Sequence, residues 1–480
     1  MVMNACGEQE FIRDYSKAIK ENGAALFIGS GLSRAAGYAD WKGILKEAAT
    51  DIGLSVEKES DLISLAEYYV NNKGRAKINT TISKYFSQKI PSTETHRILA
   101  TLPIKSYWTT NYDKLLERTF DEMEVPYSFL TDDDSFKKYI IGEGILLHKL
   151  HGDVDTPSEA VITKKDYEEF AYKHEILLAK LKGEMCSKSF LFLGYGFQDT
   201  DIKHILTRIR LFYKDDPAKR HYCIVEKLSR EENESEEDFA YRERKQEHHI
   251  VDLKSYGIHT VLVDNYSTDI LRLLKAIRGK VYAQNVYISG ACEDGDEFYK
   301  LSMQFAKTLS SWLITKNCKI YSGYGKNIGA EVVVGANDGC RLMNRGLPKL
   351  HENVFIFPFP YKKSMEVKER KELYSSLRNK IISRTGICLI INGSKSDDGK
   401  TVISEGVLDE AKIAVGEDCL VVPIAITGGA AKQIWEKMHS WNNDYTNSVD
   451  FQNLNSVAGY DAAYKAVQSI INRHIESLSE

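Results

Sequence analysis

The stretch Ala24-Ala-Leu-Phe-Ile-Gly-Ser-Gly-Leu-Ser33 decides the fold of the first half of the chain. Its apolar residues end at Gly29 and Gly31, and a helical pattern follows. A short apolar run that stops at glycine before a helix predicts a buried parallel strand in an α/β domain. Glycines at such a strand end permit a tight turn in which backbone N–H groups face a phosphate. Taken alone, the pattern also fits a plain turn.

Comparable apolar runs recur along the chain, flanked by Gly, Asn or Asp and separated by longer helical patterns. They predict one open parallel sheet in the first half, with strands at Ser106–Thr110, Gly144–Leu150, Ser189–Gly196, His221–Val225 and His259–Val263. After a helical stretch at Asp269–Lys280 a second set begins, at Asn285–Gly290, Lys319–Gly325, Asn353–Phe359, Gly386–Gly393 and Cys419–Gly428. We therefore expect two Rossmann-type α/β domains, residues 1–283 and 284–480.

The composition argues against several classes of protein. The 480 residues include 64 Lys and Arg against 68 Asp and Glu, a net charge of -4 that provides no electrostatic case for nucleic-acid binding. Eight cysteines without a Cys-x-x-Cys pair argue against a disulfide framework and a structural metal site. No apolar run reaches the roughly 20 residues of a membrane helix. We expect a cytoplasmic protein without metal, and a charged, solvated helical segment at Glu226–Gln246.

Two further motifs follow predicted strands, Thr110-Asn-Tyr-Asp113 and His151-Gly152. Ligands of open α/β sheets gather beyond the carboxyl ends of the strands, so these motifs and the glycine turn are expected to converge. Each residue also has a structural interpretation. Asn111 could cap a helix, Asp113 could stabilise the N-terminal dipole of that helix, and His151 could be a buried, hydrogen-bonded core histidine. The ordered set favours a ligand site.

These motifs resemble, in this order, the nucleotide-binding and catalytic motifs of the sirtuin family. The resemblance covers about residues 10 to 275 and includes Gly194-Tyr-Gly-Phe197. It implies a sirtuin-like, Rossmann-type domain that binds NAD as a substrate. Asn111 is then expected to position the attacking group and His151 to accept a proton from a ribose hydroxyl. The residues implied to bind NAD are Gly29, Ser30, Gly31, Ser33, Asp113, Gly194 and Phe197.

The chemistry is compatible with this resemblance, since cleavage of an N-glycosidic bond needs a positioned leaving group and a base. Two departures from the sirtuin pattern change which molecule we expect to accept the ADP-ribosyl group. Deacylating sirtuins carry a four-cysteine module, but only Cys186 lies between His151 and Phe190, and Ser30 and Thr110 replace the usual Ala and Gln. We therefore expect water as the acceptor, giving NAD hydrolysis. Alternatives are an NAD or ADP-ribose-binding regulatory module without turnover, and an NAD-dependent deacylase.

The second domain has paired strand-end glycines in Tyr287-Ile-Ser-Gly-Ala291 and Ser322-Gly-Tyr-Gly325, which suggest a second nucleotide cradle. It is similar to the SLOG group of nucleotide-binding domains. A sirtuin-like domain followed by a SLOG domain resembles the NAD-depleting effectors of Thoeris anti-phage defence. This resemblance implies a Rossmann-like SLOG domain that binds a cyclic ADP-ribose isomer made by a TIR-domain partner.

The same resemblance implies an activator site and a homo-oligomer, with a tetramer suspected. The implied activator-binding residues are Ser289, Gly290, Gly323, Gly325, Arg378, Lys395 and Glu410, with Arg384 as a competitor for Arg378. Arg and Lys can neutralise a pyrophosphate, and a carboxylate can accept ribose hydroxyl hydrogen bonds. An aromatic set alternating with strand period is predicted to lie in the core: Tyr321, Tyr324, Phe355, Phe357 and Phe359.

Overall fold

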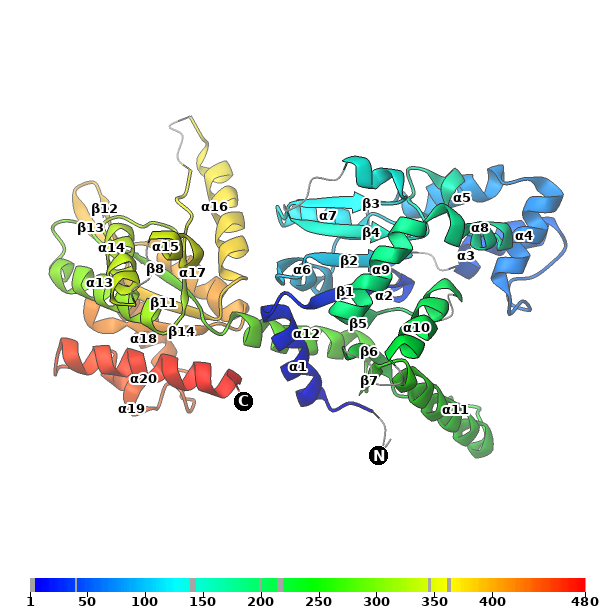
Figure 1. The fold of residues 1–480 in the computed structure, drawn as a ribbon. Coiled ribbons are helices and arrows are strands. Elements are labelled where there is room, and N and C mark those ends of the chain that lie inside the picture. Colours follow the sequence, from blue (N-terminus) through cyan, green and yellow to red (C-terminus); the bar gives the residue numbers. More distant parts are fainter. Residues whose placement is uncertain are drawn as a thin grey trace. The chain divides into compact units, whose positions relative to one another are not determined.

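The computed structural model describes residues 5–38, 41–138, 144–197, 200–213, 219–343, 347–360 and 364–479. The chain forms two compact units, Met1–Arg278 and Gly279–Glu480 (Figure 1). The domain limits expected from the sequence, after residue 283, stay a prediction. No helix in the described part of the chain has the length and apolar character needed to cross a membrane.

The first unit is built on a seven-stranded parallel sheet in the order β3-β4-β2-β1-β5-β6-β7. All six predicted strands are present. The strand bounds are β1 (Ala24–Ile28), β2 (Ser106–Thr109), β3 (Tyr127–Leu130), β4 (Ile145–Lys149), β5 (Ser189–Leu193), β6 (His221–Glu226) and β7 (Ile258–Val263). Every residue of β1 is buried, and Phe27 is paired in register with Trp108 of β2 and Phe192 of β5. The opening stretch of the sequence analysis therefore forms the centre of the sheet.

Helices flank this sheet and extend beyond it (Figure 1). A separate apolar core joins α3, α4 and α5 to the loops that follow β2 and β4, through Tyr112, Val154 and Ala160. The helices are α1 (Glu8–Lys20), α2 (Ser30–Ala36), α3 (Trp41–Asp51), α4 (Leu62–Lys73), α5 (Ala76–Phe86), α6 (Glu94–Thr101), α7 (Leu115–Glu122), α8 (Lys164–Lys173), α9 (Glu175–Ser187), α10 (Thr200–Tyr213), α11 (Glu236–Ser255) and α12 (Tyr266–Tyr282), with short 3-10 turns η1 (Asp134–Lys138) and η2 (Pro157–Glu159).

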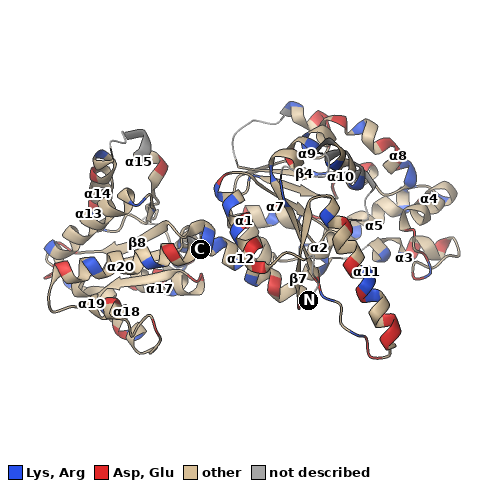
Figure 2. Cartoon of the chain, turned by 60° about the horizontal axis from the view of Figure 1, so that its bottom comes forward, with Lys and Arg blue, Asp and Glu red and all other residues tan. Residues whose placement is uncertain are grey.

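Local sequence explains where several of these helices begin. Thr163 forms a capping box with Asp166 at the start of α8, and the Ser235 hydroxyl accepts from the backbone of Asp238 at the start of α11. The segment Glu226–Gln246 is helical only from Glu236 onward. Acidic and basic residues alternate along α11 in Figure 2, and this helix buries only Ile250 and Leu253. The expectation of a charged, solvated helix is thus confirmed for its second half.

The second unit contains a five-stranded parallel sheet, in the order β10-β9-β8-β11-β14, and a two-stranded antiparallel hairpin. The strands are β8 (Asn285–Ala291), β9 (Lys319–Ser322), β10 (Val354–Ile356), β11 (Ile387–Asn392), β14 (Leu420–Ile424) and the hairpin β12 (Ser394–Asp397) and β13 (Lys400–Ile403). The helices are α13 (Tyr299–Thr315), α14 (Ile328–Leu342), α15 (Leu347–Asn353), α16 (Val367–Ile382), α17 (Glu405–Gly416), α18 (Gly429–His439), α19 (Val449–Asn453) and α20 (Tyr460–Ser479), with the turn η3 (Ala425–Thr427). Two parallel α/β units are the predicted fold class.

The core placement predicted for the aromatic set of the second unit is wrong for most of its members. Tyr324 is 47% exposed and Phe357 is 39% exposed. Tyr321 stacks on Phe355 with ring centroids 4.8 Å apart, and both rings are only partly buried. Tyr321 lies on β9 and Phe355 on the edge strand β10, where one face is only half covered, whereas Tyr324 and Phe357 lie beyond the ends of these strands.

Candidate functional site

Four predicted motifs of the first unit follow neighbouring strands of the sheet. The glycine turn follows β1, the Asn111 segment follows β2, His151 follows β4 and Gly194 follows β5, and these four strands are adjacent in the order β4-β2-β1-β5. Because all four strands are parallel, the motifs lie at the same edge. The convergence expected from the sequence is therefore present in the fold.

The glycine turn is packed directly against the loop after β5. The amide of Gly29 donates to Leu193 O at 2.8 Å, and the amide of Gly31 donates to Gly194 O at 2.9 Å. A Cβ atom on Gly29 would lie 2.4 Å from Gly194 O, and one on Gly194 would lie 2.4 Å from the Leu32 nitrogen. The close approach of the Gly29–Gly31 turn to the loop after β5 explains why glycine occupies these positions. Their two amides are engaged by β5 and its loop, so they are not free to meet a phosphate in this arrangement.

Asn111 is held beside this turn, and one of its two polar side-chain atoms makes no hydrogen bond in the described structure. Its Nδ2 donates to Ser33 Oγ at 3.0 Å, and its backbone amide donates to Thr109 Oγ1 at 3.0 Å. Its Oδ1 is buried and has no hydrogen-bond partner among the described residues. Leaving a buried acceptor unpaired costs about 1–3 kcal/mol, so such an atom calls for an explanation. A ligand that donates a hydrogen bond to Oδ1 would supply one.

His151 is buried, with 4% of its surface exposed, in the loop after β4. Its ring meets Tyr167 and Phe170 of α8 edge to face, with centroids 5.3 and 5.6 Å away. Its carbonyl accepts from the Val161 amide at 3.0 Å. The surroundings therefore fix the ring from the α8 side. The structural interpretation of a buried histidine and the catalytic interpretation are both compatible with this placement.

The remaining NAD-binding candidates have different surroundings. Ser30, the first residue of α2, is exposed, whereas Phe197 lies in the core with its ring 4.9 Å from that of Phe192. Asp113 is buried, and its Oδ1 accepts from the Leu115 amide at 2.9 Å at the start of α7. Asp113 therefore lies at the N-terminus of α7, where its structural alternative of stabilising the helix dipole applies. Its Oδ2 is a second buried oxygen without a partner in the described part of the chain.

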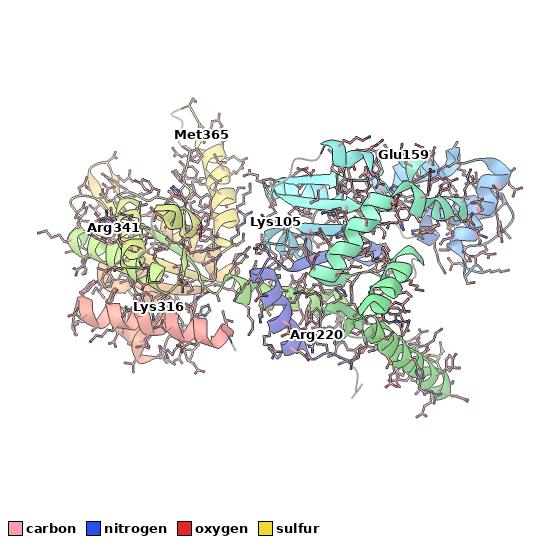
Figure 3. The ribbon with its side chains drawn as sticks, viewed as in Figure 1. Lys105, Glu159, Arg220, Lys316, Arg341 and Met365 are labelled. Carbon is pink, nitrogen blue, oxygen red and sulfur yellow. The ribbon has the colours of Figure 1, made fainter. Side chains whose placement is uncertain are left out.

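A cavity of about 510 Å³ lies beside His151 without including it. Its lining comes from the loops after β3 and β4 and from α8, and includes Gly152, Glu159, Val161, Phe170 and His174. Burial lowers the pKa of His174, against the opposing effect of Asp133 and Asp132. In Figure 3, Glu159 marks this end of the unit, and Lys105, just before β2, marks the other. The cavity thus adjoins His151 through Gly152 and Phe170, and its lining includes neither His151 nor Asn111.

Six of the seven predicted activator-binding residues line one cavity of about 130 Å³ in the second unit: Ser289, Gly290, Gly323, Gly325, Arg378 and Glu410. Glycine is required at this edge, because a Cβ atom on Gly325 would lie 2.0 Å from Gly290 O. Lys395 lies on β12, opposite Val402, and does not line the cavity. Arg384 lies just before β11, at the opposite end of the strand, which favours Arg378 over its competitor.

Arg378 and Glu410 form a buried pair at the centre of this cavity. Arg378 Nε lies 3.2 Å from Glu410 Oε1, and Ser289 Oγ donates to Glu410 Oε2 at 2.5 Å. Burial raises the pKa of Glu410, although Ser289 and Arg378 oppose this rise. The guanidinium carbon also lies 5.1 Å from the ring centre of Phe359 and 5.8 Å from that of Tyr374, which are cation–π distances.

Sequence reasoning missed several residues of this cavity. Phe359 is predicted to lie in the core, Tyr287 is named only as the start of the glycine motif, and Ser404, Gly406 and Val407 receive no role from the sequence, yet all five line the cavity. Ser404 and Gly406 belong to the start of α17, where backbone N–H groups and the helix dipole favour an anion. The signal available in the sequence was Ser404-Glu-Gly406 immediately before a helical pattern, which is a typical helix start.

In the described residues, no group of three or more His, Cys, Asp and Glu side chains is arranged to hold a metal ion. The candidate site of the first unit contains the side-chain amide of Asn111, the imidazole of His151 and backbone groups. These can orient a substrate, accept a proton and position water.

Comparisons with known proteins agree with both halves of this description. A family described as "SIR2-like domain" matches residues 105–252, and one described as "Sir2- and TIR-associating SLOG family" matches residues 269–476. The chain is 36% identical to "NAD(+) hydrolase ThsA" of Bacillus cereus (strain MSX-D12) over 97% of each chain. It is 36% identical to "NAD(+) hydrolase ThsA" of Cytobacillus dafuensis, over 90% of this chain and 88% of that one. "Defense-associated sirtuin 2" of Bacillus subtilis is 22% identical over 92% of this chain but 44% of its own length.

Proposed function

Because this chain belongs to the family of NAD(+) hydrolases named ThsA, we propose that its first unit hydrolyses NAD to nicotinamide and ADP-ribose, and that a cyclic ADP-ribose isomer bound by its second unit activates this reaction. The family is the NAD-depleting effector of Thoeris anti-phage defence, as its resemblance implied. In this proposal NAD is the substrate, no metal takes part, and the activator comes from a TIR-domain partner. The active form is a homo-oligomer.

One observation carries the hydrolytic half of the proposal. Asn111 has a buried Oδ1 without a partner in the described structure, and Ser33 fixes its Nδ2 at the carboxyl edge of the sheet. The free oxygen can accept a hydrogen bond from water or from a ribose hydroxyl and so orient it toward the anomeric carbon. His151 follows β4, which is separated from β1 by β2 in the sheet. It accepts the proton that a ribose hydroxyl releases. Water is then the acceptor of the ADP-ribosyl group.

The second half of the proposal is supported by the cavity around Arg378 and Glu410. It combines a cation, a carboxylate, an aromatic ring and a helix start within about 130 Å³. A cyclic ADP-ribose isomer carries two phosphates, ribose hydroxyls and an adenine ring, and each of these groups has a chemically suitable counterpart there. A ligand shifts an equilibrium only through different affinities for two states, so the activated and resting forms must differ at this cavity.

The catalytic half is tested by measuring nicotinamide release from NAD with and without a cyclic ADP-ribose isomer. Asn111→Ala and His151→Ala should each lower the activated rate by at least about 100-fold, the scale expected for a lost base or positioning group. Asn72→Ala, which changes an exposed asparagine on α4, should leave the rate unchanged. Near-normal release from either site variant, with a native thermal midpoint, would remove that residue from the mechanism.

The sensing half is tested by comparing two arginines of the second unit. Arg378→Ala should raise the activator concentration at half-maximal rate by at least about tenfold, equivalent to ~1.4 kcal/mol. Arg384→Ala, at the other end of β11, is the matched control and should leave this concentration unchanged. Equal effects would place the activator elsewhere. NAD binding without nicotinamide release under any condition would favour the alternative of a regulatory module without turnover.

A further inference from the structure

A buried lysine, Lys149, lies between the two segments that carry Asn111 and His151. It is the last residue of β4, and its side chain is 0% exposed. Its Nζ lies 2.8 Å from Glu117 Oε1 of α7 and 2.5 Å from Asp153 Oδ2. Asp153 itself is 4% exposed and follows His151 by two residues. One ammonium group therefore fixes α7 and the His151 loop together.

The same ammonium also holds the segment that follows Asn111. Nζ donates to Asp113 O at 2.8 Å and, more weakly, to Tyr112 O at 3.4 Å. The Val154 amide of the His151 loop donates to the same Tyr112 oxygen at 3.0 Å. The two loops are thus joined by a backbone hydrogen bond and by the Lys149 ammonium. Lys114, which pairs with Asp153 and Asp155, and the Tyr112 hydroxyl, which donates to Val161 O at 2.7 Å, add further links.

Stability alone does not account for a buried charge in this position. Taking an ammonium and carboxylates out of water costs several kcal/mol per ion, and apolar residues of similar volume often replace such groups at no loss of stability. Burial opposes the charge of Lys149, but Glu117 and Asp153 outweigh it and raise the lysine pKa. Lys114 Nζ, 3.7 Å from Asp153 Oδ1, balances the second carboxylate. Burial also raises the pKa of Glu117, against the opposing effect of Lys149, so the buried ammonium and this carboxyl stabilise each other through their contact.

We propose that Lys149 is a positioning residue for NAD hydrolysis, whose ammonium sets the Asn111 and His151 loops in one relative geometry. This inference rests on the proposed function of the first unit. It does not make Lys149 a catalytic residue, because a side chain without exposed surface cannot touch NAD. Its effect is transmitted through the carbonyl of Asp113 and the carboxylate of Asp153.

The kinetic test compares Lys149→Met with Glu184→Gln in the full-length protein, in the presence of the activator. Glu184 is a mostly buried carboxylate of α9 that accepts hydrogen bonds from Ser106 and Trp108 of β2 and pairs with Lys180 and Lys188 instead of the Lys149 cluster. Since a displacement near 1 Å can cost about 100-fold in rate, Lys149→Met should lower kcat by 10- to 100-fold while KM for NAD changes less than about threefold. Glu184→Gln should lower the thermal midpoint but leave kcat unchanged.

A second measurement does not depend on turnover. Amide hydrogen exchange of Lys149→Met should become faster at Val154 and Leu115, whose amides bind Tyr112 O and Asp113 Oδ1, while the β1 and β5 amides stay protected. Should Lys149→Met fail to fold, Glu117→Gln replaces it, because this variant leaves the ammonium paired with Asp153. Its expected effect is about a tenfold fall in kcat and the same exchange pattern.

The outcomes separate this inference from the proposed function. A folded Lys149→Met protein with kcat within twofold of wild type overturns the positioning role, as does faster exchange spread evenly over the sheet. A wild-type protein that releases no nicotinamide overturns the proposed hydrolysis and with it any role in that reaction. In that case, the exchange pattern alone decides whether Lys149 joins the two loops.

Discussion

Single glycines at the carboxyl edge of the first sheet carry a packing requirement that no other residue meets. Gly194 has φ +65°, and a Cβ atom there would lie 2.4 Å from the Leu32 nitrogen. Both the left-handed backbone and the close approach exclude a side chain. Because Gly31 donates to Gly194 O, any shift at Gly194 also displaces the turn that leads to Ser33 and hence Asn111.

Gly194→Ala should therefore destabilise the protein by about 2–4 kcal/mol, combining left-handed strain with overpacking. Gly183→Ala is the control, since this exposed glycine lies inside α9 with nothing within 4 Å of the added atom. The control should stabilise the protein by roughly 0.5–1 kcal/mol through helix propensity. Urea unfolding of the two variants measures both values. Equal effects of the same sign would contradict the packing argument.

Residue types and their order predicted which segments of the chain lie together, but not which polar atoms lack a hydrogen-bond partner in the described structure. The placement of Asn111 at a strand end followed from the apolar run before it. That the Gly29 and Gly31 amides bind the β5 segment, and that Ser33 engages only the Nδ2 of Asn111, depends on distances between loops far apart in sequence. Phe359 was misassigned because strand alternation cannot distinguish a closed core from a ring beside a cavity.

At the scale of elements, the start of α17 is the feature that shapes the second cavity. Gly406 lies in its first turn, and a Cβ atom there would lie 2.5 Å from Arg378 Nη2. The helix start and the guanidinium can approach each other only because this side chain is missing. The approach also places the N-terminal backbone of α17 next to a cation, both of which attract phosphate.

Gly406→Ala should raise the half-maximal activator concentration by about tenfold, because the displaced guanidinium loses its position in the cavity. The matched control is Gly416→Ala at the other end of the same helix, where nothing lies within 4 Å of the added atom. Isothermal titration of the activator into each variant gives the dissociation constants. A normal constant for Gly406→Ala would show that Arg378 is not held in place by α17.

Element prediction succeeded wherever a strand is a continuous apolar run. Length and composition identified the central strands β1, β5 and β11 and also the edge strands β7, β10 and β14. The edge strand β3 and the hairpin of β12 and β13 are short and partly exposed. Their sequences carry no long apolar run, so the pattern that identified the other strands is missing from them.

At the scale of the whole molecule, three buried histidines make the first unit sensitive to acid. Burial lowers the pKa of His96, His148 and His221 to about 4. Each is neutral in the folded unit and takes up a proton in the unfolded chain near pH 6.5. Their contribution to stability is therefore complete above pH 6.5 and is lost as the pH falls toward 4.

Unfolding free energy should fall between pH 6.5 and 4, with each histidine contributing up to about 1.4 kcal/mol per pH unit. Chemical denaturation at half-unit intervals checks this slope. His148→Gln removes one titrating ring, which stacks on Trp108 with centroids 3.7 Å apart, and should reduce the slope by one proton at most. An unchanged slope in this variant would mean that His148 binds a proton to the same extent in the folded and the unfolded protein.

For the proposed activator site, the existing contacts of Arg378 have a consequence for which ligands could bind there. Without any ligand, the guanidinium already has a carboxylate partner in Glu410 and two aromatic rings beside it. An incoming molecule must exchange these contacts for others that are at least as favourable, and a small anion brings only charge to that exchange. The abundant free phosphates of a cell would thus be poor triggers. A protein that hydrolyses NAD would gain from not being activated by such common anions.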